Sequence, residues 1–129
     1  MNIAQATKSI IVVDDDPSVR GVVVRALKAE GFDVHAASSG IEALIAIEKR
    51  RFDMMFLDIR MPGMGGFQVL SEMNKKHPDT VVVMLTASTG LSPQELANQK
   101  EAFAYLTKPC NLNEVTRVAH QVLDDSDVD

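Results

Sequence analysis

Five short apolar runs alternate with five longer segments of helical periodicity, and this alternation constrains the fold more than any other feature of the chain. The runs predicted to be strands are residues 10–13, 34–37, 54–57, 81–85 and 102–106. The segments with apolar residues at three- and four-residue spacing, predicted to be helices, are residues 17–30, 41–50, 67–76, 93–100 and 112–123. The order along the chain is therefore strand, helix, five times over.

The central apolar runs are apolar on successive residues, which is typical of strands buried on both faces of a parallel sheet. Helices must then cover both faces, so we expect an α/β, doubly wound (βα)5 domain. Residues able to cap helix starts precede four of the predicted helices, and Gly31 is placed to close the first. These capping candidates are Asp16, Ser38 or Ser39, Ser92, and Asn111 or Asn113.

Size and composition favour one soluble globular domain. The chain has 129 residues, 46% of them apolar and 24% charged, and no stretch approaches the ~20 apolar residues of a membrane span. Residues 1–8 contain no apolar signal segment, so we expect a cytoplasmic protein with no membrane contact. We expect the domain to cover residues 9–124, with a frayed or disordered start at 1–8 and a frayed acidic tail at 125–129.

Charge and cysteine content exclude several function classes. A net charge of -5 without clustered Lys or Arg argues against direct nucleic-acid binding by this domain. The lone Cys110 has no second cysteine with which to form a disulfide or a thiolate metal site. The three histidines, at positions 35, 77 and 120, are scattered without partners at metal-ligand spacing, and we expect structural roles for them.

Polar residues collect where the predicted strands end, which is where open parallel sheets bind their ligands. Acids follow the first and third runs, a hydroxyl follows the fourth, and a hydroxyl and an amine follow the fifth. In chain order these residues are Asp14, Asp15, Asp16, Asp58, Thr86, Thr107, Lys108 and Pro109. Because parallel strands end at the same edge of the sheet, these groups are expected to meet there.

Crowded carboxylates repel one another unless a cation lies between them. Oxygen ligands without His or Cys favour Mg²⁺, for which Mn²⁺ can substitute. An Asp held beside such an ion can attack a phosphoryl group, while the metal, a Lys and a hydroxyl hold the phosphoryl oxygens. Asp58 is best placed to be that nucleophile.

Four sequence blocks resemble, in order and in spacing, the signature blocks of chemotaxis-regulator-like receiver domains of bacterial two-component response regulators. The blocks are VVDDD at 12–16, LDIRMPGM at 57–64, MLTA at 84–87 and YLTKP at 105–109, and the resemblance spans about residues 8–124. Each block alone is weak evidence, but four together at strand ends are highly specific. The resemblance implies a flavodoxin-like sandwich whose five-stranded parallel sheet has the order 2-1-3-4-5.

The resemblance also implies a phosphoacceptor and a metal site. Asp58 would take a phosphoryl group from a sensor histidine kinase or a phosphotransfer protein. Asp14 and Asp15 would position Mg²⁺, with Asp15 and Asp58 as direct ligands and Asp14 acting through water. The backbone carbonyl of Arg60 would complete the protein's share of the coordination. Lys108 would be the salt-bridge partner of the phosphoryl group.

The same resemblance implies a switch. Thr86 would turn its hydroxyl inward to the phosphoryl group and Tyr105 would follow, shifting the surface of the fourth helix, fifth strand and fifth helix toward an output partner. Ala87, Arg60 and Ser88 would line the phosphoryl pocket, and a cis peptide bond would join Lys108 to Pro109. The domain would be a signalling phosphoprotein rather than an enzyme, limited to its own phosphorylation and dephosphorylation. A phosphorylation-dependent dimer stays open, as do the kinase, the output and the phospho-Asp58 lifetime.

Two other function classes were weighed. Asp14-Asp15-Asp16 also fits the nucleophile motif of haloacid-dehalogenase-like phosphatases, with Asp14 as nucleophile, but that alternative leaves Asp58 without a role. A flavodoxin-like FMN binder would need a hydroxyl- and Gly-rich loop where this chain has acids. Glu101 and Cys110 depart from the receiver pattern near the predicted output surface, so their effect on signalling is left open.

Overall fold

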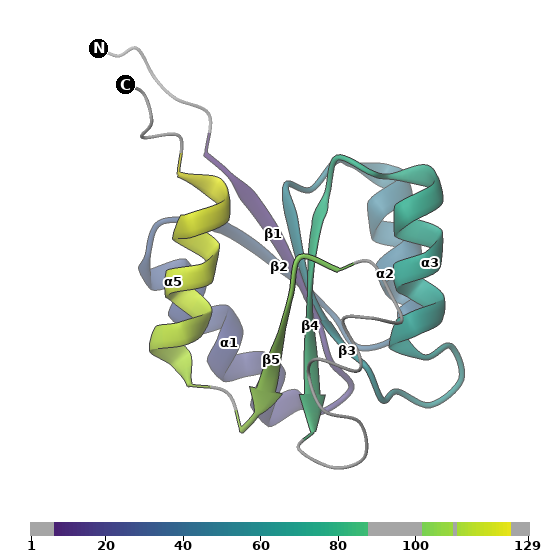
Figure 1. Ribbon diagram of the computed structural model, residues 1–129, viewed down its shortest axis with the longest axis horizontal. Helices are drawn as coiled ribbons and strands as arrows, with labels where there is room; N and C mark the ends of the chain where they lie inside the picture. Colours follow the sequence, from purple (N-terminus) through teal and green to yellow (C-terminus); the bar gives the residue numbers. More distant parts are fainter. Residues whose placement is uncertain (1–6, 88–101, 110, 125–129) are drawn as a thin grey trace.

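The computed structural model describes residues 7–87, 102–109 and 111–124. The strands are β1 (Ser9–Val13), β2 (Asp33–Ala37), β3 (Met54–Asp58), β4 (Val81–Ala87) and β5 (Ala104–Lys108). The helices in these ranges are α1 (Pro17–Ala29), α2 (Gly40–Lys49), α3 (Gly66–Lys76) and α5 (Leu112–Leu123) (Figure 1). The helix predicted at 93–100, with Ser88, Ser92, Glu101 and Cys110, lies outside the described residues.

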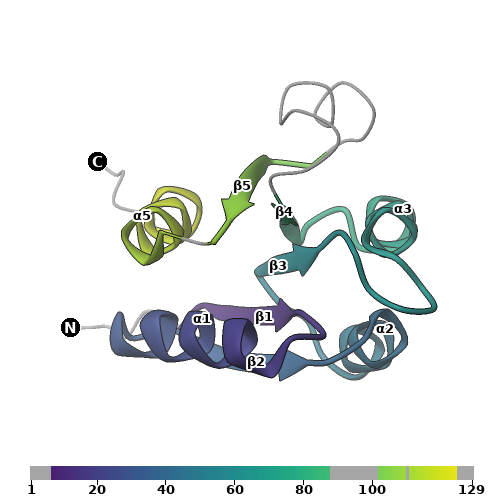
Figure 2. The same ribbon diagram turned by 90° about the horizontal axis from the view of Figure 1, so that it is seen from below.

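The five strands form one parallel sheet in the order β2-β1-β3-β4-β5, which confirms the predicted topology. Viewed along the sheet, α1 and α5 cover one face and α2 and α3 cover the other (Figure 2). Each face has its own core, because Ile10 and Val12 of β1 point to one cluster and Ile11 and Val13 to the other. All four of these side chains are fully buried, which explains the continuous apolar run.

The helix caps decide between the alternatives that the sequence left open. The Asp16 carboxylate accepts the backbone N–H of Ser18 at 2.8 Å, as an N-cap does. Ser39, rather than Ser38, caps α2, and Asn111, rather than Asn113, caps α5. Gly31 follows α1 with a φ of 97°, the left-handed conformation that glycine adopts without strain. None of the described helices is long and apolar enough to cross a membrane.

β3, β4 and β5 extend further toward their carboxyl ends than the apolar runs predicted, whereas β1 and β2 end at the predicted residues. Asp58 pairs with Leu85, Thr86 with Thr107, and Ala87 with Lys108, so these polar residues lie inside the ladder rather than beyond it. β5 begins at Ala104 and not at residue 102. Backbone N–H and C=O groups form the ladder whatever side chains they carry, so apolar runs alone placed these boundaries too early.

Candidate functional site

Acidic and basic side chains from three strands meet at the carboxyl edge of the sheet, the edge where all five strands end. Asp14 follows β1, Asp58 is the last residue of β3, and Lys108 is the last residue of β5. Lys108 Nζ lies 2.8 Å from Asp14 Oδ2 and 3.1 Å from Asp58 Oδ1. Because Asp14 is fully buried and Asp58 is 4% exposed, the ammonium faces two carboxylates that water hardly reaches.

A third carboxylate completes the cluster. Asp15 is exposed, and carboxylate oxygens of Asp14, Asp15 and Asp58 lie within 4.8 Å of one another. Burial and the charge of Asp14 raise the pKa of Asp58 to about 6, against the opposing effect of Lys108. Burial lowers the pKa of Lys108, but its contacts with Asp14 and Asp58 outweigh that effect and raise it. The site therefore carries more negative charge than one lysine neutralises.

The oxygens at this site suit a hard divalent cation. Asp14 Oδ1 accepts the backbone N–H of Asp16 at 2.9 Å. Asp14 Oδ2 is buried and lies 2.8 Å from the Lys108 ammonium, which it shares with Asp58. An oxygen of this kind, beside two further carboxylates, matches the oxygen-only ligand sets that Mg²⁺ and Mn²⁺ prefer.

The loop after β3 contributes backbone groups. The Arg60 N–H donates to Asp58 Oδ1 at 3.3 Å, while the Arg60 side chain is exposed. A side chain at Gly66, the first residue of α3, would come within 2.7 Å of the Cα of Ile59 and would also collide with the Asp58 carbonyl. Glycine therefore lets α3 begin directly against the backbone that carries Asp58. The peptide bond between Lys108 and Pro109 is cis.

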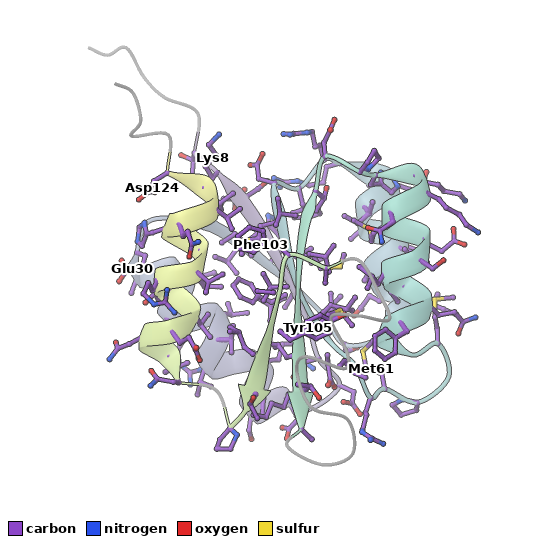
Figure 3. All side chains as sticks on the ribbon, in the orientation of Figure 1. Lys8, Glu30, Met61, Phe103, Tyr105 and Asp124 are labelled. Carbon is purple, nitrogen blue, oxygen red and sulfur yellow. The ribbon has the colours of Figure 1, made fainter. Side chains whose placement is uncertain are left out.

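The two residues predicted to change side-chain conformation on phosphorylation, Thr86 and Tyr105, lie on β4 and β5. Thr86 is buried, and its hydroxyl donates to the carbonyl of Ala87 at 3.0 Å. Tyr105 pairs with Met84, is half-buried and packs against the core on the α2–α3 face; burial raises the pKa of its hydroxyl. Figure 3 shows Tyr105 on β5 on the same side of the sheet as Met61 of the loop after β3.

One residue at the site was missed by the sequence reasoning. Arg20 Nη1 donates to the backbone carbonyl of Asp14 at 2.7 Å. The available signal was positional: Arg20 comes four residues after the N-cap Asp16, and helical side chains tilt toward the helix N-terminus. In α1 that direction points to the end of β1.

Comparison with known proteins identifies the family and the fold. Residues 10–120 match the family model of the response regulator receiver domain. The DNA-binding transcriptional regulator NtrC of Escherichia coli K12 is 37% identical over 112 residues, which cover 87% of this chain and 24% of that protein. The chain thus spans about a quarter of the length of this relative.

Solved receiver structures have the same fold. A CheY-like receiver domain from Methanospirillum hungatei superposes with a TM-score of 0.85 at 29% identity, covering 93% of this chain and 96% of that one. The receiver domain of NtrX from Brucella abortus superposes with a TM-score of 0.82 at 32% identity, covering 91% and 99%. These matches give no support to the dehalogenase-like alternative. The chain belongs to the response regulator receiver domain family, the signalling domains of two-component systems.

Proposed function

We propose that this domain accepts a phosphoryl group on Asp58 from the phosphohistidine of a histidine kinase or phosphotransfer protein, in a Mg²⁺-dependent reaction. One observation carries the proposal. The Asp58 carboxylate is buried, lies 3.1 Å from Lys108 Nζ and shares a 4.8 Å cluster with Asp14 and Asp15. A nucleophile, a fixed cation and a set of oxygen ligands are what phosphoryl transfer to a carboxylate requires.

In the transfer, an Asp58 oxygen forms the new bond to phosphorus while the bond from phosphorus to the histidine nitrogen breaks. When the second ring nitrogen of the phosphohistidine is protonated, the electron pair of the broken bond stays on the ring, which leaves as neutral imidazole. Lys108 balances charge on a phosphoryl oxygen from its position between Asp14 and Asp58. Bound at Asp14, Asp15, Asp58 and the Arg60 carbonyl, Mg²⁺ would supply further neutralisation of the phosphoryl oxygens.

The signal would then leave through Thr86. Its hydroxyl donates to the Ala87 carbonyl in this structure, and turning inward to the phosphoryl group exchanges that bond for a charge-assisted one. The vacated space would let Tyr105 rotate, which shifts a pre-existing equilibrium of β5 and the surface beside it. Ala87, Arg60 and Ser88 would flank the phosphoryl oxygens.

The proposed receiver unit covers residues 9–124; the ends expected to be frayed fall mostly outside the described residues, at 1–6 and 125–129. Its own chemistry would be limited to self-phosphorylation and autodephosphorylation in the cytoplasm. The output would be another domain or protein, and any contact with nucleic acid would be made there, because this domain is acidic. Dimerisation on phosphorylation would be one way to transmit the signal.

Chemical labelling tests the proposal. We expect acetyl phosphate and Mg²⁺ to form an acyl phosphate that borohydride reduction traps and peptide mapping assigns to Asp58. Asp58→Asn should reduce trapping at least about 100-fold, because it removes the attacking carboxylate while leaving Asp14 and Lys108 in place. Asp53→Asn, at the opposite edge of the sheet, is the matched control and should label normally. Labelling at Asp14, or undiminished labelling of Asp58→Asn, would contradict the proposal.

A further inference from the structure

Arg20 is a charged residue beside the acidic cluster that the proposed reaction does not use. Its backbone N–H donates to the Asp16 carbonyl at 2.9 Å, so it stands at the end of the first turn of α1. Its side chain is half-buried and folds back over that turn to reach the Asp14 carbonyl at 2.7 Å. Arg20 thus ties the start of α1 to the end of β1.

This contact completes the restraint of Asp14. The Asp14 N–H donates to the Ala37 carbonyl of β2 at 3.2 Å, and Asp14 Oδ1 accepts the Asp16 N–H at 2.9 Å. With Arg20 bound to the Asp14 carbonyl, three of the four polar groups of Asp14 are held by hydrogen bonds. The fourth is Oδ2, which is buried, lies 2.8 Å from Lys108 Nζ and faces the cluster.

The position of the Arg20 charge is compatible with metal binding. Its hydrogen bond goes to a backbone carbonyl, so it takes no carboxylate oxygen that a cation needs. Hydrogen bonds from the backbone and the hydroxyl of Ser38 lower the pKa of the Glu42 carboxyl, and the positive charge of Arg20 adds to this effect. The Arg20 charge therefore acts on the first turn of α2 as well as on the end of β1.

We infer that Arg20 is a positioning residue for the metal site: by fixing the Asp14 backbone it aims Oδ2 into the cluster and sets the affinity for Mg²⁺. The inference deepens the proposed function and rests on it for its biological meaning. A planar guanidinium holds a carbonyl in a defined direction, which the flexible ammonium of lysine does less well. Substitutions at Arg20 can therefore separate the effect of holding the Asp14 carbonyl from the effect of the positive charge.

The decisive variants are Arg20→Lys, which keeps the charge, and Arg20→Met, which removes it. If Arg20 acts by positioning Asp14, both variants should raise the dissociation constant for Mg²⁺ about three- to tenfold. Amide resonances followed during a Mg²⁺ titration measure this constant. A charge effect alone predicts the opposite for Arg20→Met, because losing a nearby positive charge favours a cation. Arg25→Met, on an exposed part of the same helix, should match the wild type.

Two further readouts complete the test. The phosphorylation rate from acetyl phosphate should need more Mg²⁺ in both variants yet reach within about twofold of the wild-type maximum at saturation. Without Mg²⁺, the solvent-exchange rate of the Asp16 amide should rise about threefold or more, since its acceptor is less well held. Urea unfolding checks that each variant is folded.

The outcomes distinguish the two proposals. Unchanged Asp16 exchange and unchanged Mg²⁺ affinity, or tighter Mg²⁺ binding by Arg20→Met alone, would overturn the role of Arg20. A wild-type protein that is not labelled on Asp58 would overturn the proposed function. In that case faster Asp16 exchange in both variants would still support the positioning of Asp14.

Discussion

Charged side chains are paired differently at the two edges of the sheet. At the amino edge, where the strands begin, carboxylates are matched by donors: Asp53 with Arg51 at 2.8 Å, Asp33 with Arg50 at 3.1 Å and Glu30 with His120 at 2.8 Å. At the carboxyl edge, Asp14 and Asp58 share Lys108, and Asp15 lies in the same acidic cluster. Each of these carboxylates at the amino edge has its own positively charged or N–H partner, whereas three carboxylates at the carboxyl edge cluster around one lysine.

Asp53 and Asp58 illustrate the contrast at the two ends of β3. Burial alone would raise the pKa of both carboxyl groups. At Asp53 the backbone N–H of Ser9, 2.8 Å away, and the Arg51 guanidinium outweigh burial and lower the pKa. At Asp58 the neighbouring Asp14 adds to burial, and the pKa rises to about 6. Nearby hydrogen-bond donors, rather than the extent of burial, therefore decide which of the two ionised carboxylates stabilises the protein.

Removing the shared lysine should give the largest effect. In Lys108→Met, two buried carboxylates lose their counter-ion, and we expect the free energy of unfolding at pH 7.5 without divalent ions to fall by about 3 kcal/mol. Urea denaturation measures it. The control Lys76→Met breaks an exposed pair with Glu72 at 3.4 Å and should cost less than about 0.5 kcal/mol. Equal losses in the two variants would remove the distinction between the edges.

The same substitution at the two ends of β3 should have opposite signs. The raised pKa of Asp58 means that stability present below pH 3.8 is lost as the pH rises through about 6. Asp58→Asn should therefore stabilise the Mg²⁺-free protein at pH 7 by about 1–3 kcal/mol and flatten its pH dependence between 4 and 6.

The lowered pKa of Asp53 means that its contribution is present above pH 3.8 and is lost on acidification. Asp53→Asn should accordingly destabilise the protein at pH 7 by about 1–2 kcal/mol. Urea denaturation of both variants across pH 4–8, without divalent ions, compares them directly. The comparison would fail if both substitutions shifted stability in the same direction.

The smallest effect is expected at His120, which joins α1 to α5 at the amino edge. Its Nε2 lies 2.8 Å from Glu30 and its Nδ1 3.0 Å from Asp124, and Figure 3 labels both acids at that edge. Hydrogen bonds to Glu30 and Asp124 raise the pKa of His120, so its stabilisation is full below about pH 6.5 and is lost as the pH rises further.

We expect His120→Gln to cost at most about 1 kcal/mol at pH 5.5, because the pair is partly exposed, and nothing measurable at pH 8.5. Urea denaturation at the two pH values tests this. Glu30→Gln, which removes one of the two negative charges beside the ring, should show the same trend with a smaller amplitude. A cost that persists unchanged at pH 8.5 would mean that His120 acts by packing on Phe32, whose ring centroid lies 5.0 Å away, and not by charge.

Much of the fold followed from local patterns. The bounds of α5 were predicted to the residue, because Asn111 caps its start and apolar residues repeat along one face. The start of β5 was misplaced, since Ala102 and Phe103 are apolar but precede the ladder. Side-chain polarity marks burial well, but it marks the extent of backbone pairing poorly.

The sequence by itself determined the fold class, because the spacing of apolar residues along the chain shows which segments are strands and which are helices. It also determined which acids, hydroxyl and amine lie at the carboxyl edge, because these residues follow the predicted strands and parallel strands end at the same edge. Only the tertiary structure decided that Lys108 contacts both Asp14 and Asp58, that the Asp14 carboxylate is fully buried, and that Arg20 holds the Asp14 carbonyl. These contacts depend on strand register and on side-chain direction. Both are set by packing among residues far apart in the chain, so no local pattern records them.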